Sequence, residues 1–239
     1  MTSEHLNHPS SPLWQDPPIQ AFIFDMDGVL IDSEPIYFEI EKSSFQHLGA
    51  TVEETEHHTY VGVTLESMFQ QVLDKHQLDH VLAEVLAFHK ENVMKVMQGH
   101  EELQAFDHVE QWIQWLSNSG IKLAVASSSP RSLIELILER TGLRPFFTVM
   151  VSGEEVAHGK PAPDIFLHAA ELLQVDPQHC VVIEDSRNGV QAAKDAGMRC
   201  IGHQNPGSGN QDLSKADIII HSYAELLELR DSLHIGVRS

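Results

Sequence analysis

The sequence predicts an α/β protein in which a parallel sheet, covered by helices on both sides, carries one all-helical insert. Short runs that are apolar at successive positions recur along the chain, as expected for strands buried on both faces. Segments with a helical spacing of apolar residues alternate with these runs, which favours parallel strands joined by helices. One stretch of about 65 residues shows helical patterns only, and this stretch predicts the insert.

The expected strands are short, and turn or polar residues follow each of them. Most are apolar at every position rather than at alternate positions. This pattern favours a sheet with both faces covered over a sheet with one face in water. The expected strands are Ala21–Phe24, Lys122–Ala126, Phe147–Val151, Cys180–Ile183, Arg199–Gly202 and Asp217–Ile220.

Four segments outside the insert place apolar residues three and four positions apart, which is typical of amphipathic helices. The first carries Val109, Trp112, Ile113 and Leu116 at this spacing. The last is short and rich in small residues, and Gly197 is expected to end it. The expected helices are His108–Ser119, Ser132–Arg140, Asp164–Leu173 and Asn188–Ala196.

The helical insert follows the first strand directly and is expected over residues 35–99, above the carboxyl edge of the sheet. Residues 19–34 and 100–239 are expected to form the α/β core. Residues 1–18 are rich in His, Ser and Pro and lack the pattern of a signal peptide, so we expect a flexible tail. Two amphipathic faces mark the insert: Leu65, Met68, Phe69, Val72 and Leu73 form one, and Val81, Leu82, Val85 and Leu86 form the other.

Composition narrows the possible partners. The chain of 239 residues has 35 acidic and 15 basic residues and a formal net charge of −20. Such a surface repels polyanions, so neither nucleic acid nor an anionic membrane is an expected partner. No apolar stretch reaches the ~18 residues of a membrane span. Cys180 and Cys200 lie in or beside apolar runs and are expected to be buried thiols, which fits a cytoplasmic protein without disulfides.

The candidate chemistry lies directly after the expected strands, because parallel α/β sheets bind ligands beyond the carboxyl ends of their strands. The first strand is followed by Asp25 and Asp27, and the strand ending at Ala126 is followed by three serines. Glu184 and Asp185 follow a third strand, and Lys160 lies in a loop before a helix. These segments therefore bring several acids, hydroxyl groups and one cation to the same edge of the sheet.

Carboxylates crowded together repel one another unless a divalent cation neutralises them, and a site with few protein ligands suits Mg²⁺. The metal is expected to bridge Asp25, Asp185 and a phosphate oxygen, with Lys160 balancing charge and Ser127 donating to the phosphate. Asp25 is the candidate nucleophile. Asp27 lies two residues on, on the same side of the strand end, and is the candidate acid and base.

Each of these pieces alone has a plainer interpretation. An isolated Asp-x-Asp is more often a solvated turn, and serines after an apolar run are more often a turn or a helix cap. A Glu-Asp pair is usually at the surface, and a Lys-Pro pair usually lies in a loop. The functional interpretation therefore depends on finding all four motifs in this order, each at a strand end or its loop.

The motifs resemble those of the haloacid dehalogenase superfamily, in the branch that holds β-phosphoglucomutase and sugar-phosphate phosphatases. The resemblance runs from about residue 19 to residue 229. It implies a Rossmann-like core and a mobile helical cap. The matching segments are FDMDGVL (24–30), VASSS (125–129), GKPAPDIF (159–166) and IEDSRNG (183–189).

The same resemblance implies the roles of individual residues. Asp25 would be the nucleophile and Asp27 the acid and base. Ser127, Ser128 and Lys160 would bind phosphate. The Mg²⁺ cofactor would be held by Asp25, the Asp27 carbonyl, Glu184 and Asp185. Asp27 matches the phosphatase and mutase pattern, whereas dehalogenases generally lack an acid at this position.

A phosphatase is favoured over a mutase by two departures from the mutase pattern. The segment Tyr60–Thr64, including Gly62 and Val63, resembles the mutase's substrate loop. However, Leu65 stands where the mutase has an arginine for the second phosphate, and Tyr37 stands where it has a histidine. Arg131 resembles a residue of the phosphatases and is a candidate substrate contact, with a surface arginine as the alternative.

The sequence thus predicts a Mg²⁺-dependent phosphatase that hydrolyses a small phosphorylated metabolite, such as a sugar phosphate, through an aspartyl phosphate. A hexose phosphate mutase is the first alternative. A non-catalytic phosphate-binding module is the second, although the presence of both Asp25 and Asp27 argues against it. The sequence specifies neither the substrate nor the oligomeric state, and a monomer is taken as the expectation.

Overall fold

The computed structural model describes residues 14–57, 60, 64–101 and 103–236. The chain divides into two compact units. The α/β unit comprises Met1–Ile31 and Gln104–Ser239, and the helical unit comprises Asp32–Leu103. The sequence placed the helical insert at residues 35–99. Among the described residues, no helix combines the length and the apolar character that crossing a bilayer requires.

The α/β unit contains a six-stranded sheet in the order β4-β3-β2-β5-β6-β7, and all of its strand pairs are parallel. The first strand in sequence, β2, lies at the centre of the sheet. The expected α/β class is therefore confirmed. The strands are β2 (Ala21–Phe24), β3 (Lys122–Ser127), β4 (Val149–Ser152), β5 (Cys180–Glu184), β6 (Arg199–His203) and β7 (Ile218–Ile220).

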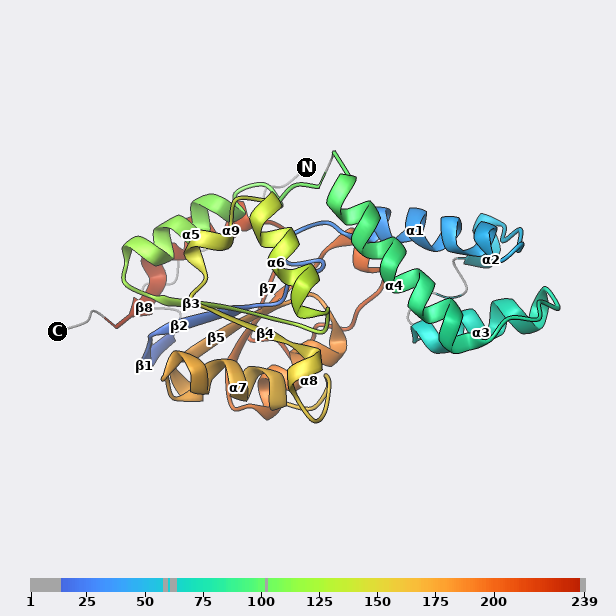
Figure 1. Cartoon of the computed structure of the whole chain (residues 1–239). Helices are drawn as coiled ribbons and strands as arrows, with labels where there is room; N and C mark the ends of the chain where they lie inside the picture. The colour runs from blue at the N-terminus through green and yellow to red at the C-terminus, as the bar shows by residue number, and fades with distance from the viewer. Residues whose placement is uncertain (1–13, 58–59, 61–63, 102, 237–239) are drawn as a thin grey trace, which may run out of the picture. The chain divides into compact units, whose positions relative to one another are not determined.

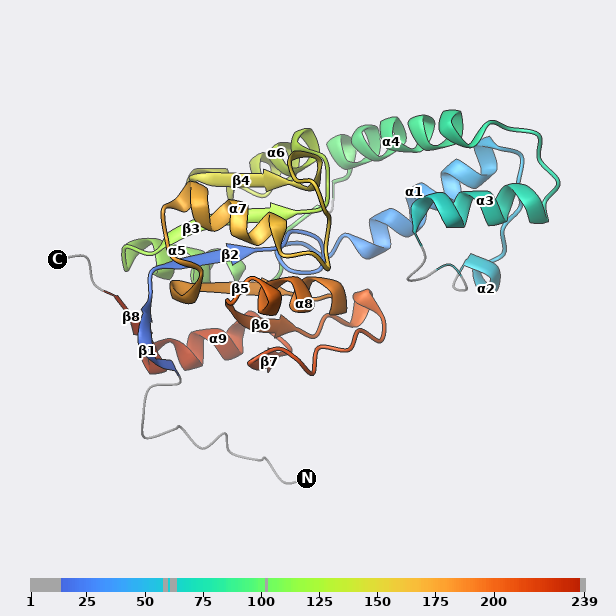
Figure 2. The ribbon, with the colours of Figure 1, turned by 90° about the horizontal axis from the view of Figure 1, so that it is seen from below.

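Helices cover both faces of this sheet, with α7 and α8 on one side and α5, α6 and α9 on the other (Figures 1 and 2). The central strand shows why both faces are apolar. Phe22 packs edge-on against Trp112 of α5, whereas its neighbours Ala21 and Ile23 belong to the buried cluster that includes α7 and α8. The helices are α5 (Val109–Asn118), α6 (Arg131–Arg140), α7 (Asp164–Leu173), α8 (Arg187–Asp195) and α9 (Tyr223–Leu229).

The helical unit has its own apolar core. Phe45 and Phe69 are buried in it, with ring centroids 5.6 Å apart. Met68, Phe69, Val72 and Leu73 are all buried, so the first amphipathic face noted in the sequence faces this core, apart from Leu65, which is exposed. The helices of this unit are α1 (Glu34–His47), α2 (Glu54–His57), α3 (Leu65–Lys75) and α4 (Leu82–Gly99).

The N-terminal region differs from the flexible tail expected for residues 1–18. Residues 14–18 belong to β1 (Trp14–Ile19), which pairs in parallel with β8 (Leu233–Ile235). The carbonyls of Pro17 and Pro18 accept hydrogen bonds from Arg199 Nη2 and His179 Nδ1, each at 2.7 Å. The prolines made this segment look irregular, and its partner strand lies at the other end of the chain. Residues 1–13 lie outside the described residues.

The two cysteines are buried free thiols, as expected. Cys180 begins β5 and Cys200 lies in β6, both within the apolar cluster beneath α7 and α8. Burial raises the pKa of Cys180 to about 12. Both thiols are therefore packing residues of the sheet.

Candidate active site

Three neighbouring parallel strands run in register and set the position of the site. Phe24 of β2 pairs with Val125 of β3 and with Ile183 of β5. The next residue, Asp25, therefore lies beside the ends of β3 and β5, and its backbone N–H donates to the carbonyl of Ile183 at 3.0 Å. The in-register ends of parallel strands thus bring together residues that are more than 100 positions apart.

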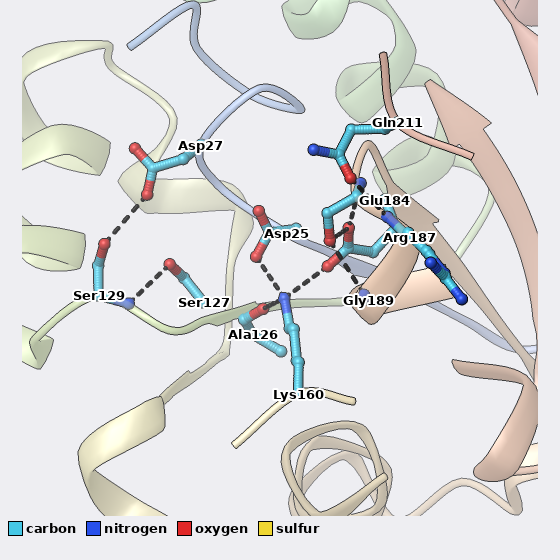
Figure 3. A network of polar contacts seen from close by, with 11 residues as sticks. Asp25, Asp27, Ala126, Ser127, Ser129, Lys160, Glu184, Arg187, Gly189 and Gln211 are labelled. Carbon is cyan, nitrogen blue, oxygen red and sulfur yellow. Dashed lines mark hydrogen bonds and ion pairs between the residues drawn. The ribbon is translucent and has the colours of Figure 1, made fainter. Parts of the chain in front are cut away.

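Lys160 lies between two of the predicted acids. Its Nζ is 2.6 Å from Asp25 Oδ1 and 2.6 Å from Glu184 Oε1, and 3.2 Å from the carbonyl oxygen of Ala126. Figure 3 shows the three charged side chains pointing toward one another. All three are nearly inaccessible to solvent. The lysine is therefore held by two charge-assisted hydrogen bonds in a buried setting.

Glu184 is fixed from a second direction by the start of α8. Its Oε2 accepts hydrogen bonds from Ser186 N and Ser186 Oγ, both at 2.9 Å. Ser186 caps α8, because its Oγ also accepts from Gly189 N at 3.0 Å. A Cβ atom at Gly189 would lie 1.8 Å from Cδ of Glu184. Only glycine therefore leaves room for the carboxylate in its present place.

The charge in this cluster is not balanced. Burial raises the pKa of Asp25 well above its usual value, Lys160 opposes the rise, and the charges of Glu184, Asp185 and Asp27 add to it. Burial and the charge of Glu184 raise the pKa of Asp185 to about 7. The ammonium group of Lys160 therefore does not offset all the acids that surround it.

Three of these acids form a candidate cation site. Asp25, Glu184 and Asp185 each offer a carboxylate oxygen, and these oxygens lie within 4.8 Å of one another. All three residues are buried. Hard oxygen donors and excess negative charge are the features that suit Mg²⁺. The residues present therefore fit a divalent cation, as the sequence predicted for this edge of the sheet.

Asp27 has a neighbour that is not among the predicted site residues. Ser129 Oγ donates to Asp27 Oδ2 at 3.0 Å, and Figure 3 shows the two side chains turned toward each other. Ser129 is the last of the three serines at positions 127–129, and the first two are the predicted phosphate ligands. The contact joins two loops 102 positions apart in sequence, so spacing alone did not indicate which serine would meet the acid.

The predicted phosphate ligands differ in their surroundings. Ser127 is buried at the end of β3, and its Oγ accepts from the backbone N–H of Ser129 at 3.1 Å. Ser128 is exposed. Ser127 thus shapes the turn that carries Ser129, and the structure brings Lys160 but neither of these two serines into hydrogen-bond contact with the described acids.

The predicted substrate residues either make their contacts outside this cluster or are not among the described residues. Arg131 Nη1 donates to the carbonyl of Met150 at 2.9 Å and to Glu155 Oε1 at 2.8 Å, and its Nε lies 3.4 Å from Glu135. Its guanidinium therefore supports the start of α6 and the end of β4. Gly62 and Val63 lie outside the residues that the structure describes.

A family profile matches most of the chain, in agreement with the motifs and with the geometry of the site. Residues 22–203 match the profile of the haloacid dehalogenase-like hydrolases. The chain belongs to this family. The matched span begins in β2, just before Asp25, and ends with β6. It includes the whole acidic cluster and Lys160.

Individual relatives place this haloacid dehalogenase-like hydrolase among phosphatases of similar length. It is 36% identical to a phosphorylated carbohydrates phosphatase of Thermotoga maritima over 183 residues, which are 77% of this chain and 84% of that protein. It is similar to the crystal structure of CbbY from Rhodobacter sphaeroides in complex with phosphate, with a TM-score of 0.77, 28% identity and coverage of 89% and 99% of the two chains.

A third relative bears on the mutase alternative. A Thermotoga maritima crystal structure, assigned provisionally as a β-phosphoglucomutase, matches this hydrolase with a TM-score of 0.77 and 32% identity. The match covers 90% of this chain and all of the other. The predicted resemblance to the β-phosphoglucomutase and sugar-phosphate phosphatase branch is therefore confirmed.

Proposed function

We propose that the chain is a Mg²⁺-dependent phosphatase that hydrolyses a small sugar phosphate through an aspartyl phosphate on Asp25. The observation that carries this proposal is the position of Lys160, 2.6 Å from both Asp25 and Glu184, beside a third acid that completes a cation site. Burial raises the pKa of Asp25, whereas Lys160 and a bound cation would favour the ionised carboxylate that is required to attack phosphorus.

Asp25 would act as the nucleophile. One of its carboxylate oxygens forms a bond to phosphorus while the bond between phosphorus and the ester oxygen breaks. Lys160 holds Asp25 Oδ1, which leaves Oδ2 as the attacking oxygen. Water then attacks the phosphorus of the aspartyl phosphate, and this second step releases inorganic phosphate and restores the carboxylate.

Asp27 would move the protons. It gives a proton to the leaving alkoxide in the first step and takes one from water in the second. Ser129 holds one of its oxygens through the 3.0 Å hydrogen bond. This contact restricts the carboxyl group to one orientation. The resemblance to the family implies the same role for this acid.

The metal would be held by the side chains of Asp25, Glu184 and Asp185 and by the carbonyl of Asp27. When bound, Mg²⁺ supplies positive charge that offsets the charge of the acids and of the phosphate. Lys160 adds a second positive group from the protein. Ser127 and Ser128 are proposed to bind phosphate oxygens. The resemblance to the family implies this role for both serines.

The names of two relatives support a proposal for the substrate class. The Thermotoga maritima relative is named for phosphorylated carbohydrates, and CbbY is described in complex with phosphate. We propose that the substrate is a phosphorylated sugar and that the enzyme works as a monomer in the cytoplasm. Specificity is assigned to the helical unit, where Gly62 and Val63 belong to the segment that resembles a substrate loop.

A mutase is the second candidate, because the provisional β-phosphoglucomutase structure matches 90% of this chain with a TM-score of 0.77. Feeding β-glucose 1-phosphate with a bisphosphate primer separates the two activities. Accumulation of glucose 6-phosphate would identify a mutase, and release of inorganic phosphate would identify a phosphatase. Leu65 and Tyr37, in place of the mutase's arginine and histidine, favour release of phosphate.

A panel of phosphorylated sugars and p-nitrophenyl phosphate, with and without Mg²⁺, tests the proposed function. We expect phosphate release that requires Mg²⁺ and stops when EDTA is added. Asp25→Asn is the matched control, because it removes the charge and keeps the size of the side chain. Absence of turnover on every ester, with retained binding of phosphate, would instead favour a non-catalytic binding module.

A further inference from the structure

A segment at the carboxyl end of β6 contacts both of the loops that carry the acids. This segment, His203–Ser208, includes the end of β6 and the short 3-10 turn Pro206–Ser208. His203 is buried, and its Nδ1 lies 2.8 Å from the carbonyl oxygen of Gly28, three residues after Asp25. A carbonyl can only accept, so Nδ1 carries the proton. Ser208 Oγ contacts Asp185 Oδ2.

Gly28 marks how closely these parts approach. Its backbone has a φ of +72°, a region that favours glycine. A Cβ atom at this position would lie 1.9 Å from Asp185 Oδ2 and 2.8 Å from Ser208 Oγ. A methyl group at position 28 would therefore not fit. The loop after Asp25 packs directly against the acid at the end of β5 and against the segment after β6.

The hydrogen bonds in this segment have a single direction. Asn205 is buried, and its Oδ1 accepts from the backbone N–H of Gly207 at 3.0 Å. This contact fixes the amide, so Asn205 Nδ2 donates to Ser208 Oγ at 3.0 Å. Ser208 has one proton to give, and it points toward Asp185 Oδ2. Asn205 and Ser208 thus form a chain of hydrogen bonds that ends on Oδ2 of Asp185.

We propose that Ser208 is a positioning residue that presents Asp185 to the metal through a single oxygen and so favours Mg²⁺ over Ca²⁺. Ser208 orients the carboxyl group through Oδ2, and we assign Oδ1 as the oxygen that binds the ion. Mg²⁺ is small and takes one oxygen from each carboxylate in a regular octahedron, whereas Ca²⁺ accepts both oxygens and more ligands. Partners that orient a metal-binding side chain contribute strongly to affinity. This inference rests on the proposed metal site.

Thermal unfolding of the full chain, titrated separately with Mg²⁺ and Ca²⁺ after removal of metal by EDTA, tests the proposal without measuring activity. An ion that binds the folded protein raises Tm with concentration, and the rise gives an apparent Kd. We expect Ser208→Ala to weaken Mg²⁺ binding about tenfold while Ca²⁺ binding changes by less than about twofold. The Tm without metal should stay near that of the unchanged chain.

Two matched variants control this measurement. Ser208→Thr keeps the hydroxyl and should restore the preference for Mg²⁺. Ser117→Ala removes a hydroxyl from an exposed position on α5 and should change neither affinity.

The role of Ser208 is overturned if Ser208→Ala binds Mg²⁺ and Ca²⁺ as tightly as the unchanged chain does. It is also overturned if the variant loses affinity for both ions by the same factor. In either case the metal site itself stands. If neither ion raises the Tm of the unchanged chain, the metal site itself and the role of Ser208 both fall.

Discussion

The ammonium nitrogen of Lys160 lies 2.6 Å from Asp25 Oδ1, at the buried end of the central strand. It also contacts Glu184, so one cation joins two acids that would otherwise repel each other. The attraction of these acids raises the pKa of Lys160 above its usual value although burial opposes the rise. The lysine therefore stays charged throughout the range in which the acids are ionised.

Lys160→Met tests this relationship. The variant keeps the length of the side chain and removes the charge, so repulsion among the acids is no longer offset. We expect kcat/KM for p-nitrophenyl phosphate to fall about 100-fold or more, and the Tm in EDTA to fall because a buried pair is broken. Lys215→Met, which removes an exposed lysine in contact with Gln191, is the control. If kcat/KM of Lys160→Met stays within twofold of the unchanged chain, catalysis does not depend on the charge of Lys160.

Asp27→Asn should slow esters according to their leaving groups. An alkoxide leaving from a sugar phosphate needs a proton, whereas p-nitrophenolate leaves readily without one. We expect kcat/KM to fall by about 10²–10⁴ for a sugar phosphate and by much less for p-nitrophenyl phosphate. Ser129→Ala should show the same pattern in weaker form, because Ser129 only orients the acid. Equal losses on both esters would exclude proton donation by Asp27.

Gly189→Ala should impair the site from within α8. The added methyl group would overlap the Glu184 carboxylate, so the acid must leave its contacts with Lys160 and Ser186. We expect Mg²⁺ affinity and kcat/KM each to fall at least about tenfold. Gly99→Ala places the same group where nothing lies within 4 Å and should be neutral. Full metal affinity in Gly189→Ala would show that Glu184 tolerates displacement.

Glu56 is expected to make the stability of the folded chain depend on pH, through contacts within the helical unit. Burial alone would raise the pKa of Glu56, but hydrogen bonds from Lys75, Tyr60 and His76 outweigh it and lower the pKa to about 2. A lowered pKa in the folded state stabilises the fold above the unfolded pKa, and this contribution is lost as pH falls.

Glu56→Gln should therefore lower the Tm by about 2–4 °C near neutral pH. The difference from the unchanged chain should persist above about pH 4.5 and disappear toward pH 2. Thermal unfolding followed by circular dichroism at a series of pH values measures it. Because all other acids titrate in both proteins, the difference isolates Glu56. A difference that grows as pH falls would contradict the assigned contacts.

The sequence predicted the sheet well because burial on both faces leaves a local signal. Each expected strand from Ala21 to Ile220 has a counterpart in the six-stranded sheet, and the helix Asp164–Leu173 has the predicted bounds. The strands β1 and β8 were missed, since β1 contains two prolines and pairs with residues at the far end of the chain. Pairing over such a distance has no local pattern from which to predict it.

The sequence predicted those site residues whose positions are set by the ends of the strands. The acids Asp25, Glu184 and Asp185 converge as expected, and Lys160 joins them. The supporting residues Ser129 and Ser208 were not identified, because their roles depend on how loops fold back onto the acids. Ser208 lies beyond the end of β6, in the turn Pro206–Ser208, whereas Glu184 and Asp185 lie directly at the end of β5.

The most direct test of covalent catalysis at Asp25 is ¹⁹F NMR of the protein with beryllium fluoride and Mg²⁺. Beryllium fluoride bonds to a carboxylate oxygen as a phosphoryl group would, so it reports the nucleophile without a known substrate. We predict protein-bound fluorine resonances in the unchanged chain that are lost in Asp25→Asn, a variant that keeps the fold and loses turnover. Bound resonances that persist in Asp25→Asn, together with retained turnover, would contradict the account.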